Sequence, residues 1–445
     1  MLKPLADQIL ETYSPEPKFG RAVALDPPVD LAHFSAFTGG QPFGAFKAMR
    51  ETAPVCWCKE PAELGGGFWA LTRYDDVRAV SLEPKTFSSQ KGGILMAYGN
   101  PAQRHPVLHR ASLDQMINMD PPIHFELRRE HLPFFTQKYV ADLKVKVEAK
   151  VTTLLDTIAP MGACDLVEHV SAELPLFTLS EILGIPESDR PKLVRWMHFL
   201  EIAGYIVAEK NFGSVDPTFF AEFLSNVQEM FDYGRALLLK RRAEPREDLL
   251  TALALAKVDG DLMPDEFLDG SWLLIVFAGN DTTRNSISGT IKLLTEFAAE
   301  KARVQANLAL LPTMVDEAIR MVSPVMYMRR TATKDAEIRG QKIAEGEKVI
   351  MYYGAANRDP AVFADPDRFD ASRANAKDHI AFGIGPHVCL GQRVANMQLE
   401  AVYRQILTRF PDMQWTGEID IAPNNFVHAI RKIGVKFTPE KRKAA

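Results

Sequence analysis

FGIGPHVCLG, residues 382–391, is the stretch of the 445-residue chain that says most about its fold. Its glycines permit backbone angles that other residues resist, and they let the chain approach a flat ligand closely. Cys389 lies near the end of this cysteine loop (residues 382–391), just before an amphipathic helix that we expect from Leu390 to Phe410. The N-terminus of a helix lowers the pKa of a thiol, and the thiolate is the form that binds a metal. The loop therefore predicts a metal-ligating Cys389, with a structural cysteine in a glycine-rich turn as the alternative.

The composition is that of an ordinary globular protein, with 47% apolar and 24% charged residues. A net charge of −5 gives no attraction to polyanions, so we expect no nucleic acid partner. Four cysteines, without the spacing of a disulfide framework or a zinc site, are typical of a reducing cytosol. The longest apolar run, Trp272–Ala278, is far too short for a membrane span. We therefore expect a cytoplasmic protein without a membrane anchor.

Helical patterns dominate the chain after a loop-rich segment over about residues 1–50. Residues 123–310 carry apolar side chains at helical spacing, and one long helix is expected over about 264–300. Residues 325–352 alternate more, and their glycines punctuate short strands. The pattern predicts a mainly α fold with a minor β region, organised as a single domain over residues 1–445.

A second informative stretch, AGNDTT at residues 278–283, lies inside the long helix. The apolar run before it predicts a buried helix, where polar groups cost free energy unless they are hydrogen-bonded. Two interpretations of Asp281 and Thr282 are open. Their polar groups are hydrogen-bonded where the helix packs against its neighbours, or they take part in catalysis.

The cysteine loop, with AGNDTT upstream of it, resembles the haem-binding loop of the cytochrome P450 family, the haem-thiolate monooxygenases. The resemblance extends from about Trp69 to Phe437. It implies the single triangular-prism fold of that family and haem b as cofactor. Cys389 would be the proximal ligand of the iron, with His387 near a haem propionate and Phe382 beside the thiolate.

The same resemblance gives AGNDTT a role in oxygen activation. Thr282 would place its hydroxyl beside the oxygen, and Asp281 would relay protons from solvent. Ala278 would leave room for oxygen over the iron. His124 and Arg128, at positions i and i+4, match the family's propionate-binding pair, and Arg330 matches a further propionate position. A solvated, charged helix face is the alternative for His124 and Arg128, and Arg329 blurs the register of Arg330.

Glu317 and Arg320 form an ExxR pair, a spacing that is weak by itself because three other Glu–Arg pairs share it. Their order relative to the two motifs matches the family, where such a pair joins a buried network with a later arginine. Arg368, in PDRF, matches that third position. We expect these three residues to be structural supports and not catalysts.

The function that the resemblance implies is hydroxylation of an apolar substrate by dioxygen. An alkane, a fatty acid, a terpenoid or a sterol side chain would be the substrate, and Leu274, Phe277, Val325 and Phe426 would line its pocket. With no fused flavin module read in the sequence, electrons would pass from NAD(P)H through a ferredoxin reductase and a ferredoxin to a monomeric enzyme. Arg129, Lys138 and Arg393 would offer positive charge to an acidic ferredoxin. A peroxide-driven enzyme and a non-catalytic haem sensor or ligand carrier are the alternatives.

Overall fold

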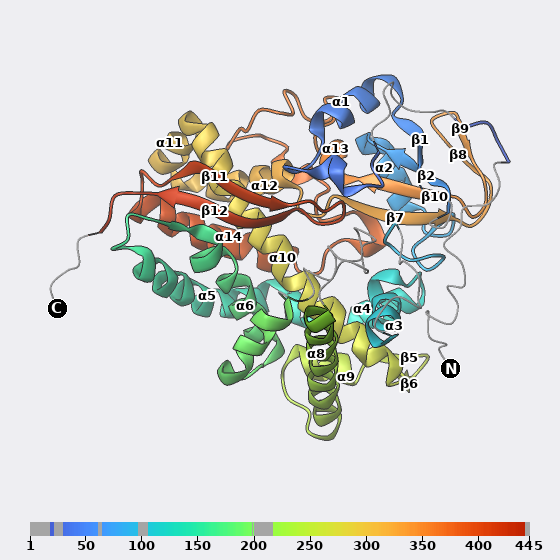
Figure 1. The fold of residues 1–445 in the computed structure, drawn as a ribbon, viewed down its shortest axis with the longest axis horizontal. Coiled ribbons are helices and arrows are strands. Elements are labelled where there is room, and N and C mark those ends of the chain that lie inside the picture. Colours follow the sequence, from blue (N-terminus) through green and yellow to red (C-terminus); the bar gives the residue numbers. More distant parts are fainter. Residues whose placement is uncertain are drawn as a thin grey trace.

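The computed structural model describes residues 18–21, 30–60, 65–96, 106–197, 199 and 217–440. Its principal helices are α1 (Phe43–Thr52), α2 (Tyr74–Leu82), α3 (Pro106–Leu113), α4 (Ile123–His131), α5 (Gln137–Ile158), α6 (Glu173–Leu183), α8 (Pro217–Ala243), α9 (Leu249–Ala254), α10 (Glu266–Glu296), α11 (Ala298–Ala306), α12 (Leu311–Val322), α13 (Tyr353–Ala356) and α14 (Gln392–Arg409). Figure 1 shows α10 running through the middle of the molecule, with the two larger sheets in the upper half of the view and the β5–β6 pair at its lower edge.

The strands form small sheets that join distant parts of the chain. They are β1 (Val55–Lys59), β2 (Gly67–Leu71), β3 (Phe87–Ser88), β4 (Ala163–Asp165), β5 (Lys257–Val258), β6 (Asp261–Leu262), β7 (Tyr327–Ala332), β8 (Ala336–Ile338), β9 (Gln341–Ile343), β10 (Lys348–Tyr352), β11 (Gln414–Ala422) and β12 (Ala429–Lys436). The largest sheet has the order β1-β2-β10-β7-β3, in which only the β2–β10 pair is parallel. A second sheet has the order β11-β12-β4.

Helix α10 crosses the centre of the molecule and contacts α3, α6, α8, α12 and both long strands β11 and β12 (Figure 1). Glycines allow these neighbours to come close. A Cβ atom at Gly270 would lie 1.8 Å from the carbonyl oxygen of Asp114, and one at Gly289 would lie 2.6 Å from Cγ2 of Val322. Such contacts are possible only without a side chain, so the glycines fix how α10 sits against α3 and α12.

The main hydrophobic core lies around α10, between α5, α6, α8, α12, α14 and β12. Smaller clusters cover the two faces of the five-stranded sheet, under α2 on one side and under α1 on the other. The expected mainly α fold with a minor β region is confirmed. The two expected helices are found at Glu266–Glu296 and Gln392–Arg409. In the part of the chain that the structure describes, no helix is both long enough and apolar enough to cross a bilayer.

Candidate active site

The cysteine loop is closed by a backbone hydrogen bond in which Cys389 N–H donates to the Phe382 carbonyl at 2.8 Å. Gly383 and Gly385 have φ angles of +72° and +76°, in the left-handed region that favours glycine. Gly385 also lies against α2, where a Cβ atom would meet the Ser81 carbonyl oxygen at 2.9 Å. The glycines that marked this loop in the sequence therefore have a steric reason.

The Cys389 side chain is accessible to water and yet lies deep within the protein. This depth raises the pKa of the thiol, although the backbone N–H groups of Gly391 and Gln392 and the nearby Arg128 cation act in the opposite direction. The expectation of a lowered pKa was wrong for the protein without metal, because desolvation of the thiolate outweighs the helix N-terminus. A bound metal ion deprotonates a thiol by its own charge, so metal ligation does not require a low thiol pKa beforehand.

Two histidines and two arginines converge beside the cysteine loop. The rings of His124 and His387 stack with their centroids 4.0 Å apart. Arg128 donates through Nη2 to the Val388 carbonyl at 2.5 Å, which joins α4 to the loop. Burial first, then the Arg128 and Arg330 cations, lower the pKa of His124 to about 4. The same causes, with His124 added, hold the pKa of His387 well below its ordinary value.

This cluster is rich in donors and positive charge. His124 Nδ1 is buried and has no hydrogen-bond partner among the described residues. Asp120 lies near Arg330, but its carboxylate already accepts the Ser88 hydroxyl and the Ser89 N–H. Two further carboxylates would satisfy the cluster. The residues present therefore fit haem b, with its two propionates here and Cys389 as the thiolate ligand.

Arg329 and Arg330 point to opposite faces of β7, as neighbours on a strand must. Arg330 is buried on the side of His124 and His387. Arg329 turns away, toward the Thr331 hydroxyl at 3.2 Å and the Met96 carbonyl at 3.3 Å. The strand register thus places Arg330, and not Arg329, in the cationic cluster.

On α10, Ala278 is exposed although the helix is otherwise largely buried. Thr282 lies one turn further on the same face, and its hydroxyl bonds back to the Ala278 carbonyl at 3.2 Å. Asp281 is buried, and its carboxylate lies 3.4 Å from Asn280 Nδ2 and 3.5 Å from Arg284 Nη2. The structure therefore places a hydroxyl and an acid side by side along α10, beside an accessible alanine.

The predicted pocket residues come from three segments. Leu274 and Phe277 are partly buried on α10, within the turn before Ala278. Val325 and Phe426 are brought together, since Val325 pairs with Val427 and Met326 N–H donates to the Phe426 carbonyl at 2.8 Å. The resemblance also implies pocket lining from residues 85–118 and about 196–235, and within these ranges residues 97–105 and 200–216 lie outside the described residues.

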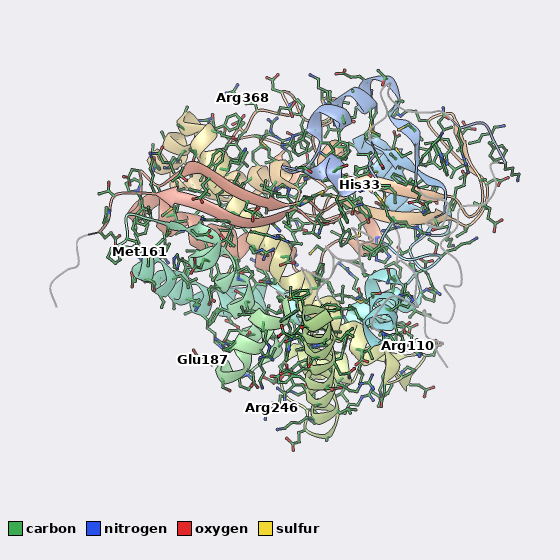
Figure 2. All side chains as sticks on the ribbon, in the orientation of Figure 1. His33, Arg110, Met161, Glu187, Arg246 and Arg368 are labelled. Atoms are coloured by element: carbon green, nitrogen blue, oxygen red, sulfur yellow. The ribbon has the colours of Figure 1, made fainter. Side chains whose placement is uncertain are left out.

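The Glu317–Arg320 pair is fully buried, with hydrogen bonds of 2.7 and 2.9 Å. The third member of the network is Arg373, whose Nε lies 2.9 Å from Glu317 Oε1. The prediction of Arg368 was wrong, because its side chain is 63% exposed and points outward at the edge of the molecule (Figure 2). Burial of Phe369 between the two arginines orients this segment, and the sequence motif does not indicate which arginine turns inward.

Two buried asparagines escaped the sequence analysis. Asn357 accepts the Ile380 N–H at 2.8 Å, donates to the Ser323 hydroxyl at 2.8 Å, and offers its carbonyl to Arg320. It thereby ties the buried network to the segment that begins the cysteine loop. Asn285 bridges α10 and β12 in the same way. The sequence did contain a signal for Asn285, because a polar amide side chain one helical turn after Asp281, in an otherwise apolar helix, indicates a buried hydrogen bond.

A cavity of about 470 Å³ opens on the outer side of the cysteine loop. We call it the loop-side pocket; it is lined by Phe125, Arg128, Arg129, Leu132, Gly385, Pro386 and Val388. Phe125 and Leu132 are about half exposed, at 51% and 46%, which is unusual for large apolar side chains. The loop-side pocket is thus an apolar surface feature with arginines at its margin.

Comparison with known proteins gives a consistent result. The family model described as "Cytochrome P450" matches residues 211–437, which is 227 of the 445 residues. The linalool 8-monooxygenase of Pseudomonas putida is 34% identical over 424 residues, covering 92% of this chain and 99% of that protein. The steroid C26-monooxygenase of Mycobacterium tuberculosis is 32% identical, covering 93% and 98%.

Solved structures agree with the sequence relatives. A cytochrome P450 of Mycobacterium marinum, solved in complex with pseudoionone, superposes with a TM-score of 0.81 at 33% identity, covering 96% of this chain and all of that one. Cytochrome P450-153 from Novosphingobium aromaticivorans gives 0.79 at 30% identity, covering 92% and 98%. The fold, the cysteine loop and these relatives lead to one conclusion: the chain belongs to the cytochrome P450 family and is a monooxygenase.

Proposed function

We propose that this monooxygenase hydroxylates an apolar substrate at an alkyl carbon, within a terpenoid, a lipid chain or a sterol side chain. The names of three relatives support this substrate class, since they are a linalool 8-monooxygenase, a steroid C26-monooxygenase and a methyl-branched lipid omega-hydroxylase. Partly buried Leu274, Phe277, Val325 and Phe426 supply apolar surface of the right kind. The observation that carries the proposal is the Cys389 thiol beside a donor cluster that fits two carboxylates.

Haem b would be held by Cys389 at the iron and by His124, Arg128, Arg330 and His387 at the propionates. When bound, it supplies the iron at which dioxygen is activated for attack on a C–H bond. Thr282 offers a hydroxyl hydrogen bond from α10, and Asp281 behind it passes protons inward. The overall reaction consumes substrate, dioxygen, two electrons and two protons, and it yields the hydroxylated product and water.

The electrons would come from NAD(P)H through a ferredoxin reductase and a ferredoxin. The loop-side pocket is a suitable docking surface because it lies directly outside the cysteine loop. Its apolar floor can accept an apolar side chain of the ferredoxin, while Arg129, whose side chain is 74% exposed, attracts an acidic rim. Lys138 and Arg393 are exposed nearby in sequence and extend the positive charge.

A reconstitution assay tests the proposal. Purified holoenzyme is mixed with linalool, NAD(P)H, a ferredoxin and its reductase, and each component is then omitted in turn. We expect linalool to shift the iron toward high spin, and we expect hydroxylated product only in the complete mixture. Product formed with hydrogen peroxide alone at the same rate would favour the peroxide-driven alternative. Tight binding of apolar ligands without any NAD(P)H consumption would favour the sensor or carrier.

A further inference from the structure

Asn285 lies one turn after Asp281 on α10 and is completely buried. Its Nδ2 donates to the Asp281 carbonyl at 2.7 Å, and its Oδ1 accepts the Ile430 N–H at 2.7 Å. Both bonds are short for neutral amides. One side chain therefore connects the backbone of the proposed proton-relay residue to strand β12.

The segment just before Ile430 is a well-tied turn. Asn424 Oδ1 accepts the N–H groups of Phe426 and Val427 at 2.8 and 3.3 Å. Val427 pairs with Val325, and His428 N–H donates to the Pro324 carbonyl at 2.7 Å. We call residues 424–428 the pocket turn, because Phe426 is one of the proposed substrate contacts. Only Ala429 separates the pocket turn from Ile430, so a displacement of the turn reaches Ile430 through the backbone.

Asp281 is held in two different ways. Its carbonyl accepts the 2.7 Å bond from Asn285, and its carboxylate lies 3.4 Å from Asn280 Nδ2 and 3.5 Å from Arg284 Nη2. A backbone held by a short bond gives the carboxylate of a proton-carrying residue a defined starting position. The position of the backbone decides from where the carboxylate starts.

We propose that Asn285 is a positioning residue that couples the pocket turn to Asp281. A substrate that presses on the pocket turn stabilises, through Ile430 and Asn285, the backbone position from which Asp281 delivers protons. The coupling acts through two buried hydrogen bonds and needs no rearrangement of α10. The inference rests on the proposed function only for the role of Asp281 in proton delivery. The hydrogen-bonded connection between β12 and α10 exists whatever the substrate is.

Two substitutions separate the roles of the two bonds. Asn285→Leu removes both. Asn285→Ser keeps a hydroxyl that bonds back to the Asp281 carbonyl, as Ser286 does to the Thr282 carbonyl, but it is too short to reach Ile430. Thr251→Val is the control, because Thr251 on α9 is also buried and also makes one side-chain donation, to Asp248 Oδ1, and one backbone acceptance, from the Arg246 N–H.

Hydrogen exchange of the holoenzyme measures the connection directly. We expect Asn285→Ser and Asn285→Leu to exchange several-fold faster than the wild type at Ile430 and, in the same samples, across residues 278–286. Thr251→Val should leave both regions unchanged. Faster exchange at Ile430 without any change over residues 278–286 in either Asn285 variant would overturn the coupling. This readout is independent of catalysis.

The chemical consequence is measured as the fraction of NAD(P)H electrons lost to hydrogen peroxide, with linalool as the probe. We expect Asn285→Ser to raise this fraction several-fold while the carbon monoxide spectrum stays that of the wild type. The fraction for Thr251→Val should match the wild type. If Asn285→Ser loses the same fraction of electrons to hydrogen peroxide as the wild type, the proposal is wrong. If the wild type itself forms no product, the proposed function fails, and the exchange experiment still decides the connection.

Discussion

The backbone of Cys389 is held by its N–H bond to the Phe382 carbonyl, while the N–H groups of Gly391 and Gln392 act on the thiol itself. Replacement of the sulfur removes the contacts of the thiol but leaves the backbone bond to Phe382 in place. We therefore predict that Cys389→Ala folds but loses the red-shifted Soret band that thiolate-ligated haem shows when reduced under carbon monoxide. Cys164→Ala, which removes a half-buried thiol from β4, is the control and should keep the band. A retained band in Cys389→Ala would show that another group ligates the iron.

At α10 we predict different outcomes for the hydroxyl and for the acid. Thr282→Ala should bind substrate and accept electrons normally, yet release most of them as hydrogen peroxide, because the hydroxyl beside the oxygen is gone. Asp281→Asn should lower turnover about tenfold or more through slower proton delivery. Thr283→Val is a control at the next position of the same helix turn, where the side chain is buried. Wild-type rate and coupling in both test variants would remove the relay from the mechanism.

His131 carries a prediction about pH. It is buried, and neither ring nitrogen has a hydrogen-bond partner among the described residues. Burial, followed by the Arg128 cation, lowers the pKa of His131 from 6.5 to about 4. The unfolded chain therefore binds a proton at a pH where the folded protein does not, and stability falls as the pH drops from about 6.5 toward 4.

Substitution of His131 by leucine removes that proton uptake. Between pH 7 and pH 5 the wild type should lose about 2 kcal/mol of unfolding free energy through this residue alone. Over the same pH range the unfolding free energy of His131→Leu should fall by about 2 kcal/mol less than that of the wild type, as measured by urea denaturation at both pH values. His33→Gln, at an exposed position, should leave the pH dependence as it is. Equal slopes for His131→Leu and the wild type would show that His131 is protonated in the folded state.

Single residues also show where sequence reasoning ends. Cys389, Asp281 and Thr282 stood out because their neighbours are unusual for the helix or loop that holds them. Arg373 did not, because PDRFDASR contains two arginines and only the packing of Phe369 decides which one turns inward. Asn285 was missed for a similar reason, since its partner Ile430 lies 145 residues away in the sequence.

At the scale of elements, α10 owes its position to close contacts at glycines. We predict that Gly270→Ala destabilises the fold by about 1–3 kcal/mol, because its Cβ would meet the Asp114 carbonyl and the backbone of one element must move. Gly44→Ala is the control within α1, where nothing lies within 4 Å of the new Cβ. It should be neutral or stabilise by up to about 1 kcal/mol. Equal unfolding free energies for the two variants would contradict this account of α10.

Elements with long periodic patterns were predictable, as the agreement at α10 and α14 shows. The sheets were predictable only as short strands. Their order was not, because β2 and β10 pair across 280 residues and no local signal selects that partner. The parallel pairing of Trp69 with Val349 depends on the tertiary packing that brings β2 and β10 together.

At the scale of the whole molecule, the net charge of −5 contrasts with the basic margin of the loop-side pocket. We predict that Arg129→Glu slows electron transfer from the ferredoxin at least several-fold, with the largest effect at low salt, while substrate binding and the carbon monoxide spectrum stay unchanged. Leu132→Ser should slow it with little dependence on salt. Stopped-flow reduction of the haem measures both.

Arg246→Glu is the control for charge alone. Arg246 lies on the loop after α8, at the lower edge of the molecule in Figure 2, far from the cysteine loop. The Arg246→Glu variant should be reduced by the ferredoxin at the same rate as the wild type. If Arg129→Glu and Arg246→Glu behave alike, the ferredoxin docks elsewhere.

The ties that run from Arg320 through Asn357 to Ile380 involve only atoms of the polypeptide. These hydrogen bonds anchor the cysteine loop from its N-terminal side, at a distance in the chain from Cys389. This matters for the lifetime of the protein in a cell. We expect a molecule that has lost its haem to keep the hydrogen bonds of this segment. It would then bind haem again without having to refold.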